Sequence, residues 1–259
     1  MVKKQLKIEQ YWSKIVIMND EIKKTPGHLS LDDIRNGCIV LAGEENKEEQ
    51  KLCMIKEEFR NGIDNIKNTT PSVTFYGSAR IKEDHPVYQV VKNLAYRISK
   101  ELNYAVITGG GPGVMEAANH GSHDAGGRSL GLTISLPHEQ HTNPYVTDEI
   151  PFEFFFARQV SMSYATEVCI FCPGGFGTFY ELFEILTNMQ TGKIGSVPII
   201  LYGSEFWNPL DKVIKEILLE KYQTVSDNDR SLYTIMDDDD AILEIVKNSK
   251  IRSGNDSLK

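Results

Sequence analysis

From residue 72 onward, short apolar runs alternate with longer segments in which apolar residues recur every three or four positions. The short runs have the length and composition of buried strands, and the periodic segments are typical of amphipathic helices. This alternation predicts an α/β fold, a Rossmann-like, doubly wound and mainly parallel sheet with helices on both faces. The predicted strands are residues 73–76, 104–108, 129–136, 167–172, 197–202 and 234–236. The predicted helices are residues 87–102, 178–190, 206–219 and 241–247 with one more from about 113, and residues 137–151 are predicted to form a loop rich in Pro and His.

Residues 1–70 show a different pattern, because they are highly charged and contain almost no strand signal. Ser30 followed by Asp33 has the spacing of a capping box at the start of a helix. We therefore predict two units, a helical N-terminal extension over residues 1–70 and a Rossmann-like nucleotide-binding catalytic domain over residues 71–259. A second helix in the extension is predicted from one apolar face, made of Leu52, Ile55, Phe59, Ile63 and Ile66.

The overall charge limits the choice of partner. The 259 residues carry a formal net charge of −8, and a surface of that sign repels nucleic acid backbones. We expect no nucleic acid partner, although a local group of backbone N–H donors can still bind a small anion. A DNA-processing protein of the Rossmann-like type is therefore a weak third hypothesis.

Cysteine usage and hydropathy indicate the compartment. Cys38, Cys53, Cys169 and Cys172 lie in apolar contexts without metal-ligand spacing, so we expect unpaired core cysteines. Residues 1–10 are charged throughout and no apolar stretch approaches a membrane span, so we expect neither a signal peptide nor a membrane partner. These features predict a cytoplasmic protein.

Two glycine-rich segments each follow a predicted strand and open a predicted helix. The first runs from Thr108 to Gly113 (TGGGPG) and the second from Pro173 to Glu181 (PGGFGTFYE). Glycine lets the backbone approach an anion closely, and a helix start offers free N–H groups and a partial positive charge. One such loop is equally well explained as a tight turn. Two at equivalent strand ends favour one ligand held from both sides.

Other phosphate and cofactor motifs fit poorly. No G-x-x-x-x-G-K-[ST] sequence is present, and the first loop lacks the third glycine and the downstream acidic residue of a dinucleotide fingerprint. We therefore expect neither an ATP-hydrolysing P-loop nor NAD, and no cofactor. His138 and His141 are three residues apart without a nearby carboxylate pair, so we expect no metal.

Two charged residues are candidates for chemistry. Glu181 could fold back on Thr178 as a capping box, or its carboxylate could project into the crevice above the second loop. Arg158 could be an ordinary ion-pairing residue, or its guanidinium could bind a phosphate or pair with Glu181. The sequence leaves both alternatives open.

The motifs TGGGPGVMEAAN (108–119), LPHEQ (136–140) and PGGFGTFYE (173–181) resemble the LONELY GUY (LOG) family of cytokinin riboside 5′-monophosphate phosphoribohydrolases. The likeness extends from Phe75 to Gly203, and the N-terminal helices look like those of the longer bacterial members. The family is also labelled lysine decarboxylase. We discount that activity because no lysine lies in a recognisable pyridoxal phosphate site.

The resemblance implies a hydrolase that cleaves the N-glycosidic bond of AMP or an N6-substituted AMP into free base and ribose 5-phosphate. The family's catalytic Arg and Glu fall on Arg158 and Glu181. One departure is Gln159, where the family usually has Lys. The resemblance also implies a homodimer or higher homo-oligomer. The implied substrate-binding residues are Ser78, Gly109, Gly110, Gly111, Glu116, Glu139, Gln159, Gly174, Gly175, Phe176, Gly177, Thr178 and Thr187.

A second hypothesis is a nucleotide sensor or carrier on the same scaffold without turnover. Its only support in the sequence is Gln159 in place of the usual Lys. Turnover of AMP distinguishes the two hypotheses.

Overall fold

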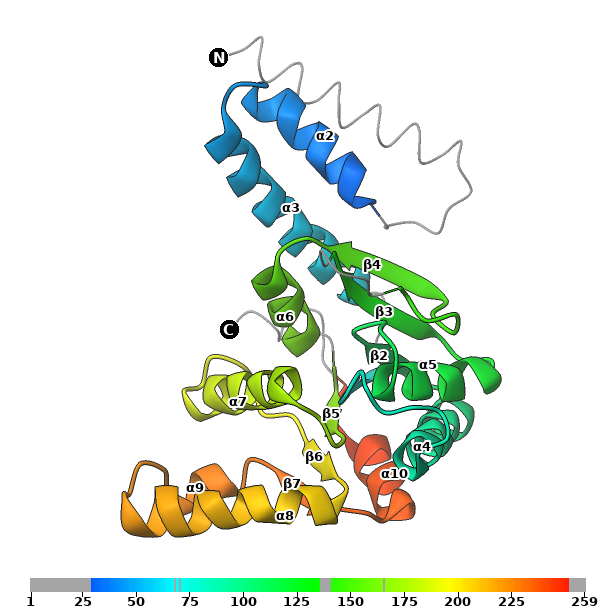
Figure 1. The fold of residues 1–259 in the computed structure, drawn as a ribbon, viewed down its shortest axis with the longest axis vertical. Helices are drawn as coiled ribbons and strands as arrows, with labels where there is room; N and C mark the ends of the chain where they lie inside the picture. The colour runs from blue at the N-terminus through cyan, green and yellow to red at the C-terminus, as the bar shows by residue number, and fades with distance from the viewer. Residues whose placement is uncertain (1–28, 68, 70, 136–140, 165, 252–259) are drawn as a thin grey trace.

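The computed structural model of the chain describes residues 29–67, 69, 71–135, 141–164 and 166–251. Seven strands form one sheet in the order β4-β3-β2-β1-β5-β6-β7 (Figure 1), and all neighbouring pairs are parallel. This architecture confirms the predicted Rossmann-like fold class. The strands are β1 (Ser72–Tyr76), β2 (Ala105–Thr108), β3 (Ser129–Ile134), β4 (Asp148–Phe152), β5 (Val168–Phe171), β6 (Ile199–Tyr202) and β7 (Thr234–Met236).

Helices cover both faces of the sheet. One face packs against α4, α5 and α10, and the other against α3, α6, α7 and α8. None of the helices in the described ranges is long and apolar enough to cross a membrane. The helices are α2 (Leu31–Ala42), α3 (Lys47–Lys67), α4 (Pro86–Leu102), α5 (Val114–Asp124), α6 (Phe155–Tyr164), α7 (Phe176–Gln190), α8 (Ser204–Val213), the π-helix η1 (Ile214–Lys221), α9 (Asp227–Arg230) and α10 (Asp239–Asn248).

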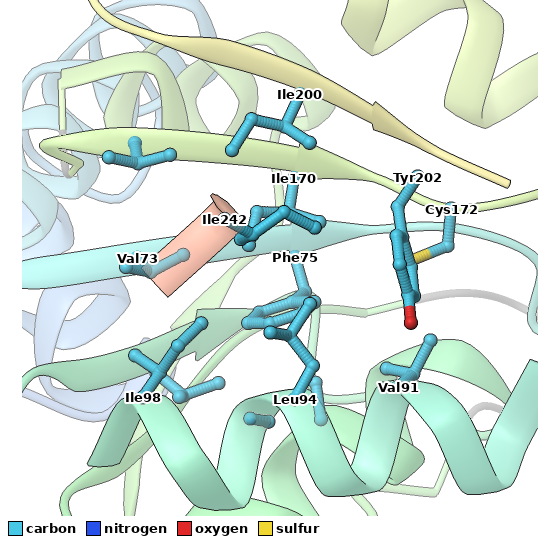
Figure 2. Close-up of a cluster of buried hydrophobic side chains, with 14 of the residues drawn as sticks. Val73, Phe75, Val91, Leu94, Ile98, Ile170, Cys172, Ile200, Tyr202 and Ile242 are labelled. Atoms are coloured by element: carbon cyan, nitrogen blue, oxygen red, sulfur yellow. The ribbon is translucent and has the colours of Figure 1, made fainter. Parts of the chain in front are cut away.

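Alternation along the strands builds two separate cores. Val73 and Phe75 of β1 point into the cluster under α4 and α10 (Figure 2), whereas Tyr76 points into the opposite cluster. Cys172 belongs to the first cluster and Cys169 to the second. Neither cysteine forms a disulfide with a described residue, as expected for two residues that lie on opposite faces of the sheet.

The strand order creates one switch point. The chain moves outward from β1 through β2 and β3 to β4, and then returns to place β5 on the other side of β1. Tyr76 at the end of β1 is paired with Phe171 at the end of β5. The loops that leave these two strands run toward opposite sides of the sheet, which opens a crevice between them.

Three elements were not predicted from the sequence, and these are β4, α6 and the short helix α9. Residues 148–152 form β4 where a loop was predicted, and residues 155–164 form α6 where no helix was predicted. β4 lies at the sheet edge and, among the described strands, pairs with β3 alone. An edge strand tolerates Pro151, because one of its sides needs no hydrogen-bond partner.

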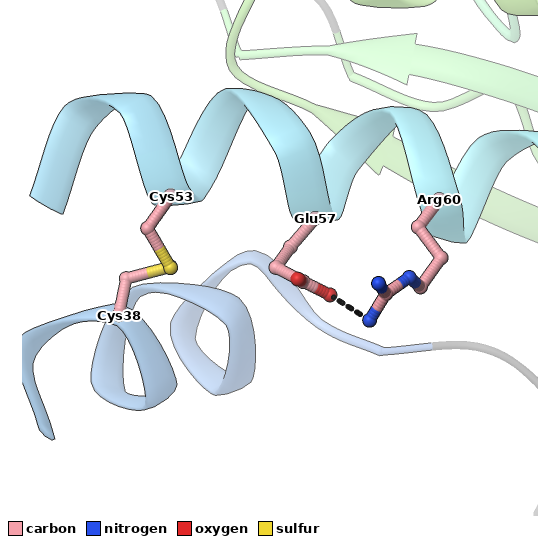
Figure 3. The surroundings of a disulfide bond; sticks show 4 residues. All are labelled: Cys38, Cys53, Glu57 and Arg60. Carbon is pink, nitrogen blue, oxygen red and sulfur yellow. Dashed lines mark hydrogen bonds and ion pairs between the residues drawn. A yellow bond between two sulfur atoms is a disulfide. The ribbon is translucent and has the colours of Figure 1, made fainter. Parts of the chain in front are cut away.

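The N-terminal helices α2 and α3 pack against each other, and α3 also packs on β4 and α6. Ser30 and Asp33 form the predicted capping box at the start of α2. Cys38 and Cys53 form a disulfide between the two helices (Figure 3), so the prediction of unpaired cysteines is wrong for this pair. The antiparallel packing brings their Cα atoms to 5.6 Å. The boundary near residue 70 stays a prediction.

Thiol titration tests the disulfide. The denatured protein is expected to show two reactive thiols, Cys169 and Cys172, before reduction and four thiols afterwards. Reduction is expected to lower the free energy of unfolding by about 3 kcal/mol, because the disulfide closes a loop of roughly 15 residues. Urea unfolding with and without reductant measures this change. Four thiols in the unreduced protein would contradict the assignment.

Candidate functional site at the sheet switch point

A cavity of about 850 Å³ opens at the carboxyl ends of β1 and β5. Its volume is in the range of pockets that hold a small organic ligand. Its position is the switch point, where open α/β sheets bind ligands. The cavity is lined by Gly77, Ser78, Ala79, Arg80, Met115, Phe155, Arg158, Gly175, Phe176, Gly177, Thr178, Phe179 and Glu181.

The second glycine loop forms one wall through the start of α7. Gly175 is the N-cap residue, and its lack of a side chain leaves the first N–H groups of α7 without a side-chain cap. These groups and the helix dipole give this wall a positive potential that suits an anion. The Thr178–Glu181 capping box is excluded, because α7 begins at Phe176 and has no side-chain cap.

Glu181 projects from the first turns of α7 and lines the cavity. None of the described residues forms a hydrogen bond with its carboxylate, so its oxygens are available to a ligand. Burial raises the pKa of Glu181 to about 7, Arg158 opposes this shift, and the nearby Glu184 carboxylate reinforces it. A carboxyl group with a pKa near neutrality can exchange a proton with a bound molecule at physiological pH.

Arg158 lines the same cavity from α6 and is 7% exposed. Its Nε donates to the backbone oxygen of Leu132 at 2.7 Å, and its guanidinium lies 5.8 Å from the centroid of the Phe155 ring. Within the described part of the chain it forms no ion pair. Burial lowers the pKa of Arg158, and the electrostatic attraction of Glu181 opposes that change. A buried cation without a bound carboxylate is a strong anion-binding group.

The first glycine loop lies beneath the cavity wall instead of lining it. Gly109, Gly110 and Gly111 are buried, and a Cβ on Gly109 would come within 2.1 Å of Nη2 of Arg158. Gly113 has a φ of 75°, and a Cβ there would come within 2.3 Å of the backbone oxygen of Ser78. Close packing against these two pocket residues therefore accounts for the glycines at 109 and 113. Contact between this loop and a ligand stays a prediction.

The other predicted site residues divide into two groups. Ser78, Gly175, Phe176, Gly177 and Thr178 line the cavity together with the two charged candidates. Gly174 lies beside it, where a Cβ would meet the Thr178 side chain. Glu139 lies outside the described residues.

The second group lies away from the cavity. Glu116 hydrogen-bonds the Tyr88 side chain and the backbone of Gly113. The Gln159 amide donates to Glu184 at 2.7 Å. Thr187 is exposed and donates to the backbone oxygen of Phe183 at 2.6 Å.

Sequence reasoning missed several lining residues, Gly77, Ala79, Arg80, Met115, Phe155 and Phe179. Gly77 to Arg80 directly follow β1, so the rule that ligands lie at strand ends could have found this loop. No local signal pointed to Phe155, because the helix that carries it was not predicted.

The fold and the cavity define a Rossmann-like protein with a ligand site at the switch point of its sheet. A family model described as "possible lysine decarboxylase" matches residues 115–246, just over half of the chain. The chain belongs to this family, which includes the LOG proteins.

Curated relatives carry a more specific description. The cytokinin riboside 5′-monophosphate phosphoribohydrolase LOG2 of Arabidopsis thaliana is 32% identical over 123 residues, which are 45% of this chain and 57% of that protein. The cytokinin riboside 5′-monophosphate phosphoribohydrolase of Rhodococcoides fascians is 24% identical over 166 residues, which are 62% of this chain and 83% of that protein. The chain therefore spans little more than half the length of the first of these relatives.

Among solved structures, a structural-genomics target named TM1055 superposes with a TM-score of 0.50 and 21% identity. The match covers 69% of this chain and 99% of that chain. This likeness supports the fold assignment alone.

Proposed function

We propose that the protein is a phosphoribohydrolase that cleaves the N-glycosidic bond of a nucleoside 5′-monophosphate, AMP or an N6-substituted AMP such as a cytokinin riboside monophosphate. The observation that carries this proposal is one cavity that combines a helix start without a side-chain cap, a buried Arg158 that forms no ion pair with any described residue, and a Glu181 carboxyl whose pKa is about 7. Membership of the family and the names of its curated relatives support the same reaction.

In the proposed complex the 5′-phosphate binds the first N–H groups of α7, within reach of the Arg80 guanidinium at the cavity rim. Phe155, Phe176 and Phe179 offer aromatic surface for the base. This arrangement directs the anomeric carbon of the ribose toward Glu181.

The reaction adds one water across the bond between C1′ of the ribose and the base nitrogen. As that bond breaks, its electron pair leaves with the base, and positive charge develops on the sugar ring. The Glu181 carboxylate stabilises this charge and accepts a proton from the attacking water. The departing base takes up one proton from solvent and Glu181 returns the proton of the water to solvent, so the net products are the neutral base and ribose 5-phosphate. Burial raises the pKa of Glu181, and the positive charge of Arg158 partly offsets this and favours the ionised carboxylate.

Incubation with AMP tests the proposal directly. Free adenine and ribose 5-phosphate in equal amounts, resolved by chromatography, are the expected products. AMP binding without either product would favour the alternative, a nucleotide sensor or carrier on this scaffold. Gln159 in place of the family's usual Lys favours that alternative, although its side chain bonds Glu184 outside the cavity.

Gly109→Ala is expected to lower kcat/KM for AMP by about 100-fold, because a displacement of about 1 Å in a catalytic group has effects of that size. The added Cβ would come within 2.1 Å of Nη2 of Arg158, which must move. Gly195→Ala is the matched control, since a Cβ there meets nothing within 4 Å. Steady-state kinetics on both variants measure the difference. Equal kcat/KM values would show that Arg158 tolerates the displacement.

We further propose that the protein is a homodimer that pairs through the exposed side of α7. Phe176, Tyr180 and Phe183 are 97%, 47% and 40% exposed and are spaced to share one side of the helix. Apolar side chains of this size on one surface are typical of an interaction site.

Light scattering after gel filtration is expected to give the mass of a dimer for the wild type and of a monomer for Phe176→Asp/Phe183→Asp. Leu52→Asp is the control, because Leu52 is an equally exposed apolar residue (56%) on α3. A wild-type monomer would contradict the proposal.

A cytoplasmic location, the absence of a cofactor and the absence of a nucleic acid partner remain part of the proposal. The net charge of −8 supports the absence of a nucleic acid partner. The buried Cys169 and Cys172, which form no disulfide, support the cytoplasmic location. The Cys38–Cys53 disulfide argues against a permanently reducing compartment.

A further inference from the structure

Helix α3 of the N-terminal extension reaches the segment that starts α6. Glu58 of α3 is 0% exposed, and its two carboxylate oxygens accept the backbone N–H groups of Glu153 at 3.1 Å and of Phe154 at 3.0 Å. These two residues immediately precede α6. A buried carboxylate is costly unless hydrogen bonds compensate its charge, and the start of a helix is a favourable place for it.

A second hydrogen bond continues this connection to the site. The backbone oxygen of Phe154 accepts the N–H of Arg158 at 3.2 Å. Phe154 therefore joins the Glu58 carboxylate on one side to the backbone of Arg158 on the other. The next residue, Phe155, lines the cavity and lies against the Arg158 guanidinium. The position of Arg158 thus depends on two consecutive hydrogen bonds that begin in α3.

The start of α6 has no side chain of its own that could replace Glu58. Phe154 is apolar, and the Glu153 carboxylate is engaged by Arg35 of α2 at 2.8 Å. Most helices are capped by a nearby Ser, Thr, Asp or Asn. Here the cap comes from a residue 96 positions earlier in the chain.

The packing around this contact leaves little freedom. A Cβ on Gly62 of α3 would come within 2.4 Å of Oγ of Ser161 and 2.8 Å of Cζ of Phe152. The backbone of α3 at Gly62 therefore packs directly against side chains of α6 and β4. One turn away, the rings of Phe59 and Phe156 lie 6.0 Å apart. The two helices therefore pack closely around the Glu58 contact.

We propose that Glu58 is a positioning residue for Arg158, and that the N-terminal helices are part of the functional site through this contact. The proposal rests on the proposed function only for its kinetic consequences. The structural link itself is independent of the ligand.

Hydrogen exchange of the residues 153–158 backbone in Glu58→Gln tests the link without any substrate. The amide of Gln has one acceptor oxygen and an NH2 group that opposes an N–H donor, so one of the two hydrogen bonds is lost. Exchange in this segment is therefore expected to increase at least about tenfold, which corresponds to about 1.4 kcal/mol. Glu57→Gln is the matched control. Glu57 is a buried neighbour on the same helix, but it pairs with Arg60 at 3.2 Å. Unchanged exchange in Glu58→Gln would overturn the proposal even if the protein hydrolyses AMP.

Steady-state kinetics then show whether Glu58 affects the function of Arg158 in the site. Glu58→Gln is expected to lower kcat about tenfold or more and to move the midpoint of the kcat–pH profile to higher pH, since a displaced Arg158 no longer favours ionised Glu181. A general loss of structure would lower the amount of active protein without moving that midpoint. In an Arg158→Met background, Glu58→Gln is expected to have little further effect on kcat. An unmoved midpoint, or full additivity of the two substitutions, would overturn the role in positioning.

The structural link and the proposed function can fail independently. If wild-type protein releases no adenine, the proposed function fails while the exchange experiment still decides the link. If Glu58→Gln does not fold, Glu58→Asp keeps the charge and withdraws it by one methylene, and the same increase in exchange is expected.

Discussion

Glu181→Gln is expected to retain the fold and to bind AMP, but to release adenine about 1,000-fold more slowly than the wild type. The amide keeps the size of the side chain and removes the negative charge that stabilises the developing sugar cation. It also removes the proton acceptor for the attacking water. Calorimetric titration with AMP and steady-state kinetics measure the two properties separately.

Glu184→Gln is the matched control. Glu184 lies one turn further along α7 and accepts a hydrogen bond from Gln159 outside the cavity. The substitution therefore removes a negative charge from a residue that has no proposed contact with the substrate. Because Glu184 raises the pKa of Glu181, this control is expected to keep its kcat and to shift the pH profile to lower pH. Adenine release by Glu181→Gln at the wild-type rate would contradict the catalytic assignment.

Thermal unfolding separates lost chemistry from lost structure. The pKa of Glu181 is raised in the folded protein, from an ordinary value near 4.5 to about 7. The folded state therefore holds the proton more tightly than the unfolded state, and stability falls as the pH rises through this interval. Gln cannot ionise. At pH 8 the Tm of Glu181→Gln is accordingly expected to equal or exceed that of the wild type.

Arg158→Met is expected to give the second largest effect, a loss of kcat/KM of about 100-fold or more with a shift of the pH profile to higher pH. Wild-type kcat is expected to rise with pH around a midpoint near 7, because ionised Glu181 is the active form. Arg158 lowers that pKa, so removal of the guanidinium raises it and moves the midpoint upward. Methionine fills similar space without charge, and kcat measured from pH 5 to 9 gives the midpoint.

Arg80→Met is the control for a general loss of positive charge. Arg80 lines the same cavity but is exposed at its rim. Its removal is expected to raise KM while leaving the midpoint in place, because an exposed cation is screened by solvent and salt. A midpoint that moves to lower pH in Arg158→Met would contradict the proposed effect of the Arg158 charge on the pKa of Glu181.

Local patterns predicted most of the sheet and its helices. The elements that escaped prediction are informative. The strand β4 contains Pro151, and its edge position is a property of the whole sheet. The helix α6 has no local capping residue, because Glu58 supplies its cap from α3. The edge position of β4 and the cap of α6 both depend on residues far away in the chain, so patterns of neighbouring residues cannot predict them.

The site shows the same division. Glycine loops at strand ends pointed to the second loop and to Glu181, both of which line the cavity. The sequence could not distinguish a glycine that binds a ligand from one that makes room for a side chain. Gly109 is packed against Arg158, a residue 49 positions later, and only the folded chain brings the two together.

By itself, the sequence of this protein determined the fold class and the motifs that resemble the family, because strand and helix periodicities and short motifs are properties of neighbouring residues. Arg158 and Glu181 became candidates for chemistry through that resemblance, and their roles stay a proposal. The tertiary structure decided which glycine loop lines the cavity, that Cys38 pairs with Cys53, and that Glu58 caps the helix of Arg158. Each of these depends on the approach of residues from different elements. That approach is set by strand order and helix packing, which no local pattern encodes.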